Sequence, residues 1–175
     1  MIRSVLTLFK TFFGIILLQK GPGDIPHSSV LFVIVAAIWF LVGVVSILVI
    51  DSYNSSGLFI DLILAFVGLA IYAIVINALG KSPRLLRALT AMLGCSTVFS
   101  ILLSGGQLVL PLLLSKDEAA WAVQLLWFWS IPVEGHIIAR TIERQWIIGF
   151  LIALVVLFAQ LQLLSVLKPM LEPAV

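Results

Sequence analysis

The sequence predicts an all-helical, polytopic membrane bundle with five transmembrane helices preceded by an N-terminal amphipathic interfacial helix. Of the 175 residues, 62% are hydrophobic and only 10% are charged, whereas soluble domains average about 25% charged residues. The mean hydropathy is +1.25. Apolar stretches recur between short polar turns, and each is close to the ~20 residues that one helical span needs. The basic residues concentrate in alternate turns, which is the third observation.

The N-terminal segment, residues 1–20, has the pattern of an amphipathic helix. Arg3, Thr7, Lys10 and Gly14 follow one another at helical intervals and so share one face. The opposite face consists of Ile, Val, Leu and Phe. A basic stripe opposite an apolar one favours a helix that lies in the membrane interface. A cleaved signal peptide and a first span are the alternatives. A signal peptide would require a small-residue cleavage site, which the chain lacks before its Gly/Pro linker at 21–28.

Five apolar segments follow the linker and form the predicted bundle at 29–168. They are residues 29–50, 57–79, 88–114, 119–139 and 146–167, and a short C-terminal tail at 169–175 comes after them. The third segment would measure roughly 40 Å as a helix, which exceeds the hydrocarbon core. Gly105, Gly106 and Pro111 predict a break or kink near its end.

The positive-inside rule gives an independent test of this layout. With the N-terminus in the cytoplasm, five spans divide the basic residues very unequally between the two sides. The outer segments hold Lys116 and Lys168. The inner segments hold Arg3, Lys10, Lys20, Lys81, Arg84, Arg87, Arg140 and Arg144. Four spans would place both termini on one side and remove this asymmetry, so the charges favour five.

Several function classes find no support in the sequence. Cys95 is the only cysteine and is predicted to be a small buried residue, and the net charge of +2 does not indicate a nucleic-acid surface. The run from Leu103 to Gln107 reads Leu-Ser-Gly-Gly-Gln, the signature of ABC-transporter ATPases, but no phosphate-binding Gly-x-x-x-x-Gly-Lys-Ser/Thr loop accompanies it. The two histidines belong to no zinc motif. We expect no enzyme, no metal and no cofactor.

Two groups of residues are candidates for a functional site. The first is an intramembrane polar site that combines an acid in the second span with a polar stripe along the third, and its members are Asp61, Ser96, Ser100, Ser104 and Gln107. An acid inside a span costs about 2.5–3.5 kcal/mol on insertion scales, so it is a functional candidate by default. Its place near a helix end leaves a solvated role open. The serine stripe is typical of helix association, and less often lines a water path.

The second group is a polar cluster at the cytoplasmic end of the fourth span. Its members are Glu134, His136, Arg140, Glu143 and Arg144. His136 and Arg140 are four residues apart and share a helical face, whereas Glu134 and His136 do not. Ordinary interfacial charge is the alternative interpretation of this group.

The layout of an amphipathic segment followed by five spans with short loops resembles the Yip1-like group of small membrane proteins. Gly23-Asp24-Ile25-Pro26 is the segment closest to that family's motifs. The resemblance is one of layout, so it assigns no functional residue.

We therefore expect a non-enzymatic membrane subunit or scaffold. Its partners would be membrane lipids and another membrane protein or a second copy of itself, with no nucleic acid. The alternative is a small channel or transporter component that uses Asp61 and the serine stripe. The short loops favour a bacterial inner membrane, with the C-terminus on the periplasmic or extracellular side.

Overall fold

The computed structural model describes residues 2–49 and 55–171 of the chain. Most of the predicted turn at 51–56 and the end of the predicted tail, residues 172–175, lie outside this range. The described elements are all helices. In chain order they are α1 (Ile2–Ile16), η1 (Pro22–Asp24), α2 (Ser29–Val49), α3 (Ser55–Ala78), η2 (Ser82–Arg84), α4 (Leu85–Leu113), α5 (Lys116–Ile142) and α6 (Trp146–Leu171).

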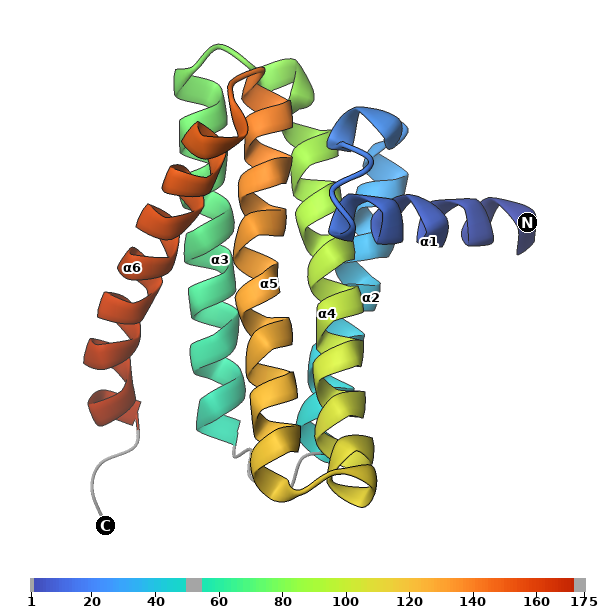
Figure 1. Ribbon diagram of the computed structural model, residues 1–175. Helices are drawn as coiled ribbons and strands as arrows, with labels where there is room; N and C mark the ends of the chain where they lie inside the picture. Colours follow the sequence, from blue (N-terminus) through green and yellow to red (C-terminus); the bar gives the residue numbers. More distant parts are fainter. Residues whose placement is uncertain (1, 50–54, 172–175) are drawn as a thin grey trace.

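Helices α2 to α6 run up and down as one bundle, and α1 lies across it (Figure 1). The connections α1–α2, α3–α4 and α5–α6 lie toward one end, which we call the basic end. The α4–α5 connection and the C-terminal end of α6 lie at the other, which we call the distal end. Short connections between successive helices produce this antiparallel arrangement.

In the described part of the chain, four helices are long and apolar enough to cross a membrane. The apolar windows are Ser29–Ser46, Phe59–Ala78, Ser82–Leu113 and Trp146–Pro169. Their outward faces are apolar as well: only 6% of the first window is buried in the bundle. A water-soluble protein rarely exposes such continuous apolar surface, so these helices are suited to lipid.

Helix α5 is the predicted span that is missing from these four. Its hydropathy is lowered by three tryptophans and by Gln124, Glu134 and His136. In the bundle, α5 packs along both α4 and α6. A helix enclosed by neighbours can carry more polar side chains than a helix surrounded by lipid, because those side chains find partners within the protein.

Helix α5 also begins earlier than the sequence predicts. Ser115–Glu118 was expected to be a turn, but only Ser115 stands outside the helix. The Ser115 hydroxyl accepts a hydrogen bond from the Glu118 backbone N–H at 3.4 Å, and the Glu118 carboxylate accepts one from the Ser115 backbone N–H at 3.0 Å. This reciprocal cap lets the polar residues form the first turn of α5.

Helix α4 is continuous through Gly105 and Gly106, where a break was expected. Pro111 lies inside its last turns. At about 1.5 Å per residue, the 29 residues of α4 and the 27 residues of α5 measure roughly 44 and 40 Å, against roughly 32 Å for the 21 residues of α2. The α4–α5 hairpin is therefore the longest part of the bundle.

The tightly packed core lies toward the basic end. In α4 the buried residues run from Ala88 to Phe99, and in α5 all but one lie between Val133 and Ile142. These stretches are the beginning of α4 and the end of α5, which meet at the basic end. The distal halves of both helices are mostly exposed or half-buried. The bundle is thus closed at one end and looser at the other.

Helix α1 docks on this core by the ring of Phe12, which lies over Gly94 of α4. A Cβ at Gly94 would come within 2.3 Å of the ring. Gly14, which its spacing placed on the polar face of α1, is buried beneath the Lys20 side chain, and Thr11 is buried as well, while Lys10, Phe9 and Phe13 are exposed. The Thr11 hydroxyl is satisfied locally, since it donates to the Thr7 carbonyl at 3.0 Å.

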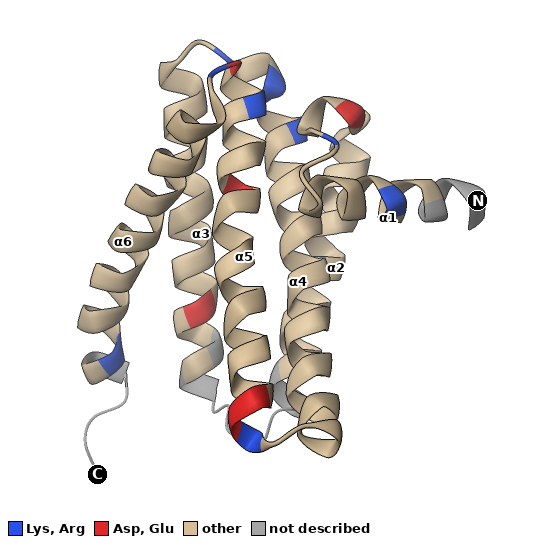
Figure 2. Cartoon of the chain, viewed as in Figure 1, with Lys and Arg blue, Asp and Glu red and all other residues tan. Residues whose placement is uncertain are grey.

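The charged residues separate between the two ends of the bundle. Figure 2 shows Lys and Arg gathered around the connections of the basic end and along α1, with a second, smaller set at the distal end. In the described part of the chain, the distal set consists of Lys116 and Lys168. The middle of the bundle carries two acids and no basic residue in this view, and these acids belong to α3 and α5.

Candidate functional site

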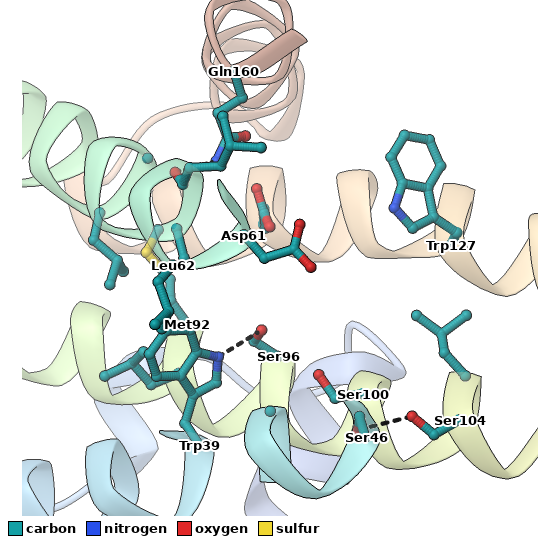
Figure 3. Close-up of a pocket in the computed structure, with 18 of the residues that line it drawn as sticks. Trp39, Ser46, Asp61, Leu62, Met92, Ser96, Ser100, Ser104, Trp127 and Gln160 are labelled. Atoms are coloured by element: carbon teal, nitrogen blue, oxygen red, sulfur yellow. Dashed lines mark hydrogen bonds between the residues drawn. The ribbon is translucent and has the colours of Figure 1, made fainter. Parts of the chain in front are cut away.

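A cavity of about 780 Å³ lies among the helices of the bundle. Helices α2, α3, α4 and α5 line it, and α6 contributes Gln160. All five residues of the predicted intramembrane polar site line this cavity: Asp61, Ser96, Ser100, Ser104 and Gln107. Figure 3 shows Asp61 and the three serines converging on the same space from α3 and α4.

The cavity faces of α3 and α4 follow helical periodicity. The α3 residues that line it include Asp61, Ala65, Gly68 and Tyr72, which are spaced by four, three and four residues. The same periodicity places the serine stripe of α4 on its cavity face. The stripe was recognisable in the sequence, whereas the α3 face was not, because Tyr72 is surrounded by apolar residues.

The serine stripe both lines the cavity and joins α4 to α2. The Ser104 hydroxyl donates to the hydroxyl of Ser46 at 2.9 Å, and the indole N–H of Trp39 donates to the Ser96 hydroxyl at 3.3 Å (Figure 3). The helix-association role that the sequence favoured is seen in these two bonds, and the stripe also lines the cavity. Trp39 and Ser46 belong to the site, although nothing in the spacing of α2 distinguishes them from its other residues.

Glu134 and Tyr72 lie at the other end of the cavity from Asp61. The Tyr72 hydroxyl donates to a Glu134 carboxylate oxygen at 2.7 Å. Tyr72 is 4% exposed, and it lies eleven residues after Asp61, which is roughly 16 Å along a helix. Both acids thus line one cavity, but at different depths.

Exposure indicates which end of the cavity is open. Asp61, Gln107 and Gln124 line its distal part and are exposed, whereas Tyr72 and Met92 line its inner part and are buried. The cavity is therefore open toward the distal half of the bundle. Toward the basic end it stops at the tightly packed core.

The lining is mixed, with more apolar than polar surface, and none of its described side chains is basic. Asp61 and Glu134 are its ionisable carboxyls, and no Lys or Arg of the described chain takes part. Trp39, Tyr72 and Trp127 add aromatic surface. A cavity of this size with a few convergent polar groups has the usual features of a small-molecule site.

The structure distributes the second predicted group, the cytoplasmic-end cluster, over separate contacts. Glu134 faces the cavity with Tyr72. His136 is buried on another face of α5, where its Nε2 lies 2.9 Å from the carbonyl oxygen of Lys20. Arg140 is exposed and packs beside Gly21. Glu134 therefore lies on one helical face, whereas His136 and Arg140 share another beside the α1–α2 connection, as their spacing requires.

Glu143 and Arg144 belong to the α5–α6 connection. The Glu143 carboxylate pairs with Lys81 and with Arg84 of the α3–α4 connection. Hydrogen bonds and charge from these two cations lower the pKa of Glu143 below its ordinary value. This ion-pair group, which we call the basic-end clasp, joins two connections that lie far apart in the sequence. The Arg144 side chain is exposed.

No family model matches the chain, and neither the curated proteins nor the solved structures include a detectable relative. The cavity and its chemistry are therefore the basis on which a function can be argued.

Proposed function

We propose that this chain is a small transporter or channel component that binds a polar solute inside the membrane. The observation that supports this proposal is the cavity, because it gathers Asp61, the serine stripe and Glu134 from separate helices into one space open toward the distal end. Polar side chains inside a membrane bundle are costly, and they commonly mark a solute or ion pathway.

In this proposal α5 crosses the membrane as a fifth helix with α2, α3, α4 and α6. Its polar side chains face the cavity or the α1–α2 connection, as Glu134 and His136 do. The N-terminus and the basic end are cytoplasmic, since basic residues concentrate on that side of membranes. A bacterial inner membrane is the setting that the short loops favour. The cavity then opens toward the outer side.

Helix α1 fits this arrangement as an interfacial helix. It lies across the bundle (Figure 1), and so parallel to the membrane plane when the bundle crosses it. Phe9, Phe13 and Lys10 are exposed on it. Aromatic rings that enter the headgroup region beside a basic side chain are typical of such helices.

A scaffold is the second candidate. The observation that favours it is the exposed apolar surface of α2, which another membrane protein or a second copy of the chain could cover. Lipid covers such a surface equally well, and a scaffold has no need of a polar cavity. Extraction in mild detergent followed by mass spectrometry tests it: a stoichiometric partner or homo-oligomer supports a scaffold, and a monodisperse monomer contradicts it.

Flux through liposomes that contain the purified full-length protein tests the transport proposal. The solutes are one cation, one zwitterion and one neutral compound, each isotopically labelled, with protein-free liposomes as the baseline. We expect at least one solute to move faster with protein. Asp61→Asn and Ser100→Leu should abolish that increase, because both residues line the cavity.

The matched controls are Asp117→Asn and Ser165→Leu, which make the same changes outside this cavity. Both controls should retain the flux of the unmodified protein. Flux equal to the baseline for all three solutes, or flux that Asp61→Asn and Ser100→Leu leave unchanged, contradicts the proposal.

A further inference from the structure

The charges of the cavity indicate the class of solute. Its ionisable carboxyls are Asp61 and Glu134, and in the described chain no basic side chain lines it. Water screens charges weakly at the buried inner end of the cavity, so the Glu134 carboxylate acts strongly on a charged solute there, and Asp61 adds a second negative charge at the exposed end. A cation is attracted at both depths, whereas an anion meets no compensating charge. The electrostatics therefore select for positive charge.

The aromatic lining favours an organic cation. Trp39, Tyr72 and Trp127 line the cavity from three different helices. The indole of Trp39 is held in place by its hydrogen bond to Ser96 at 3.3 Å and by an edge contact with Phe66, with ring centroids 6.3 Å apart. Fixed aromatic rings bind substituted ammonium groups by cation–π attraction.

The geometry fits a bare metal ion poorly. A divalent cation requires several oxygen ligands around one point, but Asp61 and Tyr72, the hydroxyl partner of Glu134, are roughly 16 Å apart along α3. Among the described residues, no three His, Cys, Asp or Glu side chains lie close enough to hold a metal. The volume of about 780 Å³ is also that of a site for a small organic molecule.

We propose that the cavity binds a small organic cation with a substituted ammonium group, first at Asp61 near the open end and then at Glu134 at the inner end. This inference rests on the proposed function and names its substrate class. Tyr72 orients the inner carboxylate by donating a hydrogen bond to one of its oxygens. The other oxygen and the aromatic walls are then available to the ammonium group.

The test measures how tightly choline and its uncharged isostere 3,3-dimethylbutan-1-ol each bind to the full-length protein in nanodiscs, and compares the two affinities. Tryptophan fluorescence reports the binding, since Trp39 and Trp127 line the cavity. We expect choline to bind at least about tenfold more tightly than the isostere, which corresponds to about 1.4 kcal/mol. Asp61→Asn and Glu134→Gln should each remove most of this preference. Asp117→Asn, the control, should retain it.

The outcomes separate this inference from the proposed function. Equal binding of the two compounds, or tighter binding of the isostere, overturns the cation assignment and leaves the transport proposal standing if the flux assay is positive. Binding of Mg²⁺ without binding of choline also overturns it. Should Glu134→Gln fail to fold, Asp61→Asn alone decides, because Asp61 is exposed and asparagine has nearly the same size. A choline preference that Asp61→Asn leaves unchanged contradicts the assignment.

Discussion

The carboxylates of Glu134 and Glu143 are both held by neighbouring side chains, one inside the bundle and the other at its exposed surface. Glu134 accepts a hydrogen bond from the hydroxyl of a buried tyrosine, and Glu143 pairs with two cations at an exposed connection. The first interaction joins α3 to α5 in the interior. The second joins the α3–α4 connection to the α5–α6 connection at the basic end. A single substitution removes either interaction, so the contribution of each to stability can be measured separately.

Tyr72→Phe tests the interior contact. It removes the hydroxyl that donates to Glu134 and keeps the ring that packs in the core. We expect a loss of about 0.5–2 kcal/mol in the free energy of unfolding, the range measured for hydrogen bonds between membrane helices. A denaturant titration in mixed micelles gives the value, and a double-mutant cycle with Glu134→Gln isolates the pairwise part. If the losses in unfolding free energy of the two single variants add up to the loss in the double variant, the Tyr72–Glu134 contact contributes nothing to stability.

Glu143→Gln tests the basic-end clasp. Since the folded protein lowers the pKa of Glu143 below 4.5, its ion pairs stabilise the fold above the ordinary carboxyl pKa, and this contribution disappears as the pH falls through the lowered value. We therefore expect the Tm of the parent to exceed that of Glu143→Gln at neutral pH and the difference to vanish in acid. Arg144→Gln is the control. A difference that persists in acid would contradict the prediction.

The sequence predicted some residues of the cavity but not others. Asp61 and the serine stripe were recognisable because an acid and regularly spaced hydroxyls are conspicuous in apolar helices. Tyr72 and Trp39 were missed because aromatic residues are ordinary in such helices. Their polar atoms become informative only when a tertiary partner, Glu134 or Ser96, is known. Glu134 was recognised as polar but grouped with the charges of the basic end.

At the scale of the elements, the contact of α5 with α6 depends on two glycines. A Cβ at Gly149 would lie 2.1 Å from the carbonyl oxygen of Gly135, and a Cβ at Gly135 would lie 2.7 Å from the Cα of Phe150. The helices therefore approach backbone to backbone. Such close approach maximises van der Waals contact, which is a major source of helix association in lipid.

Gly149→Ala should separate these two helices. Its methyl group meets backbone atoms that cannot rotate away, so we expect a cost of about 1–3 kcal/mol. Gly105→Ala is the matched control, since nothing lies within 4 Å of a Cβ there. It should instead stabilise the protein by about 0.5–1 kcal/mol through helix propensity. Thermal unfolding in detergent measures both, and a stable Gly149→Ala protein would contradict the close approach.

The docking of α1 can be followed by the single cysteine. Cys95 is 3% exposed, and its Sγ lies 3.8 Å from the carbonyl oxygen of Phe12. Gly94→Val should displace the Phe12 ring and raise the labelling rate of Cys95 by N-ethylmaleimide by about tenfold, equivalent to 1.4 kcal/mol in the opening equilibrium. Gly105→Val, far from α1, should leave the rate unchanged. Equal rates in both variants would mean that α1 does not protect Cys95.

The sequence predicted the helices well where composition alone decides them. The predominantly apolar sequences of α2, α3 and α6 predicted these helices without tertiary knowledge. The start of α5 differed because the capping pair Ser115 and Glu118 extends the helix into polar residues. The burial of Gly14 was missed because it depends on the Lys20 side chain, which folds back over α1 from the connection that follows.

For the whole molecule, the decisive question is whether α5 crosses the membrane. Single cysteines on a Cys95→Ala background answer it, with an impermeant maleimide applied to intact cells and to inverted vesicles. We expect Ser82→Cys and Gln145→Cys to react from the cytoplasmic side and Ser115→Cys from the other. Reaction of Ser115→Cys and Gln145→Cys from the same side would show that α5 does not cross, and with it the proposed topology would fail.

The α4–α5 hairpin has a consequence for the surrounding lipid. Its helices exceed α2 by roughly 9–12 Å, and its tip carries Leu112 and Leu113, which are 81% and 74% exposed. A bilayer that matches α2 would leave these leucines outside the acyl chains, so either the hairpin tilts or the lipid thickens around it. Hydrophobic mismatch therefore acts on the helices that line the cavity, and acyl-chain length becomes a physical control on how widely its distal end is open.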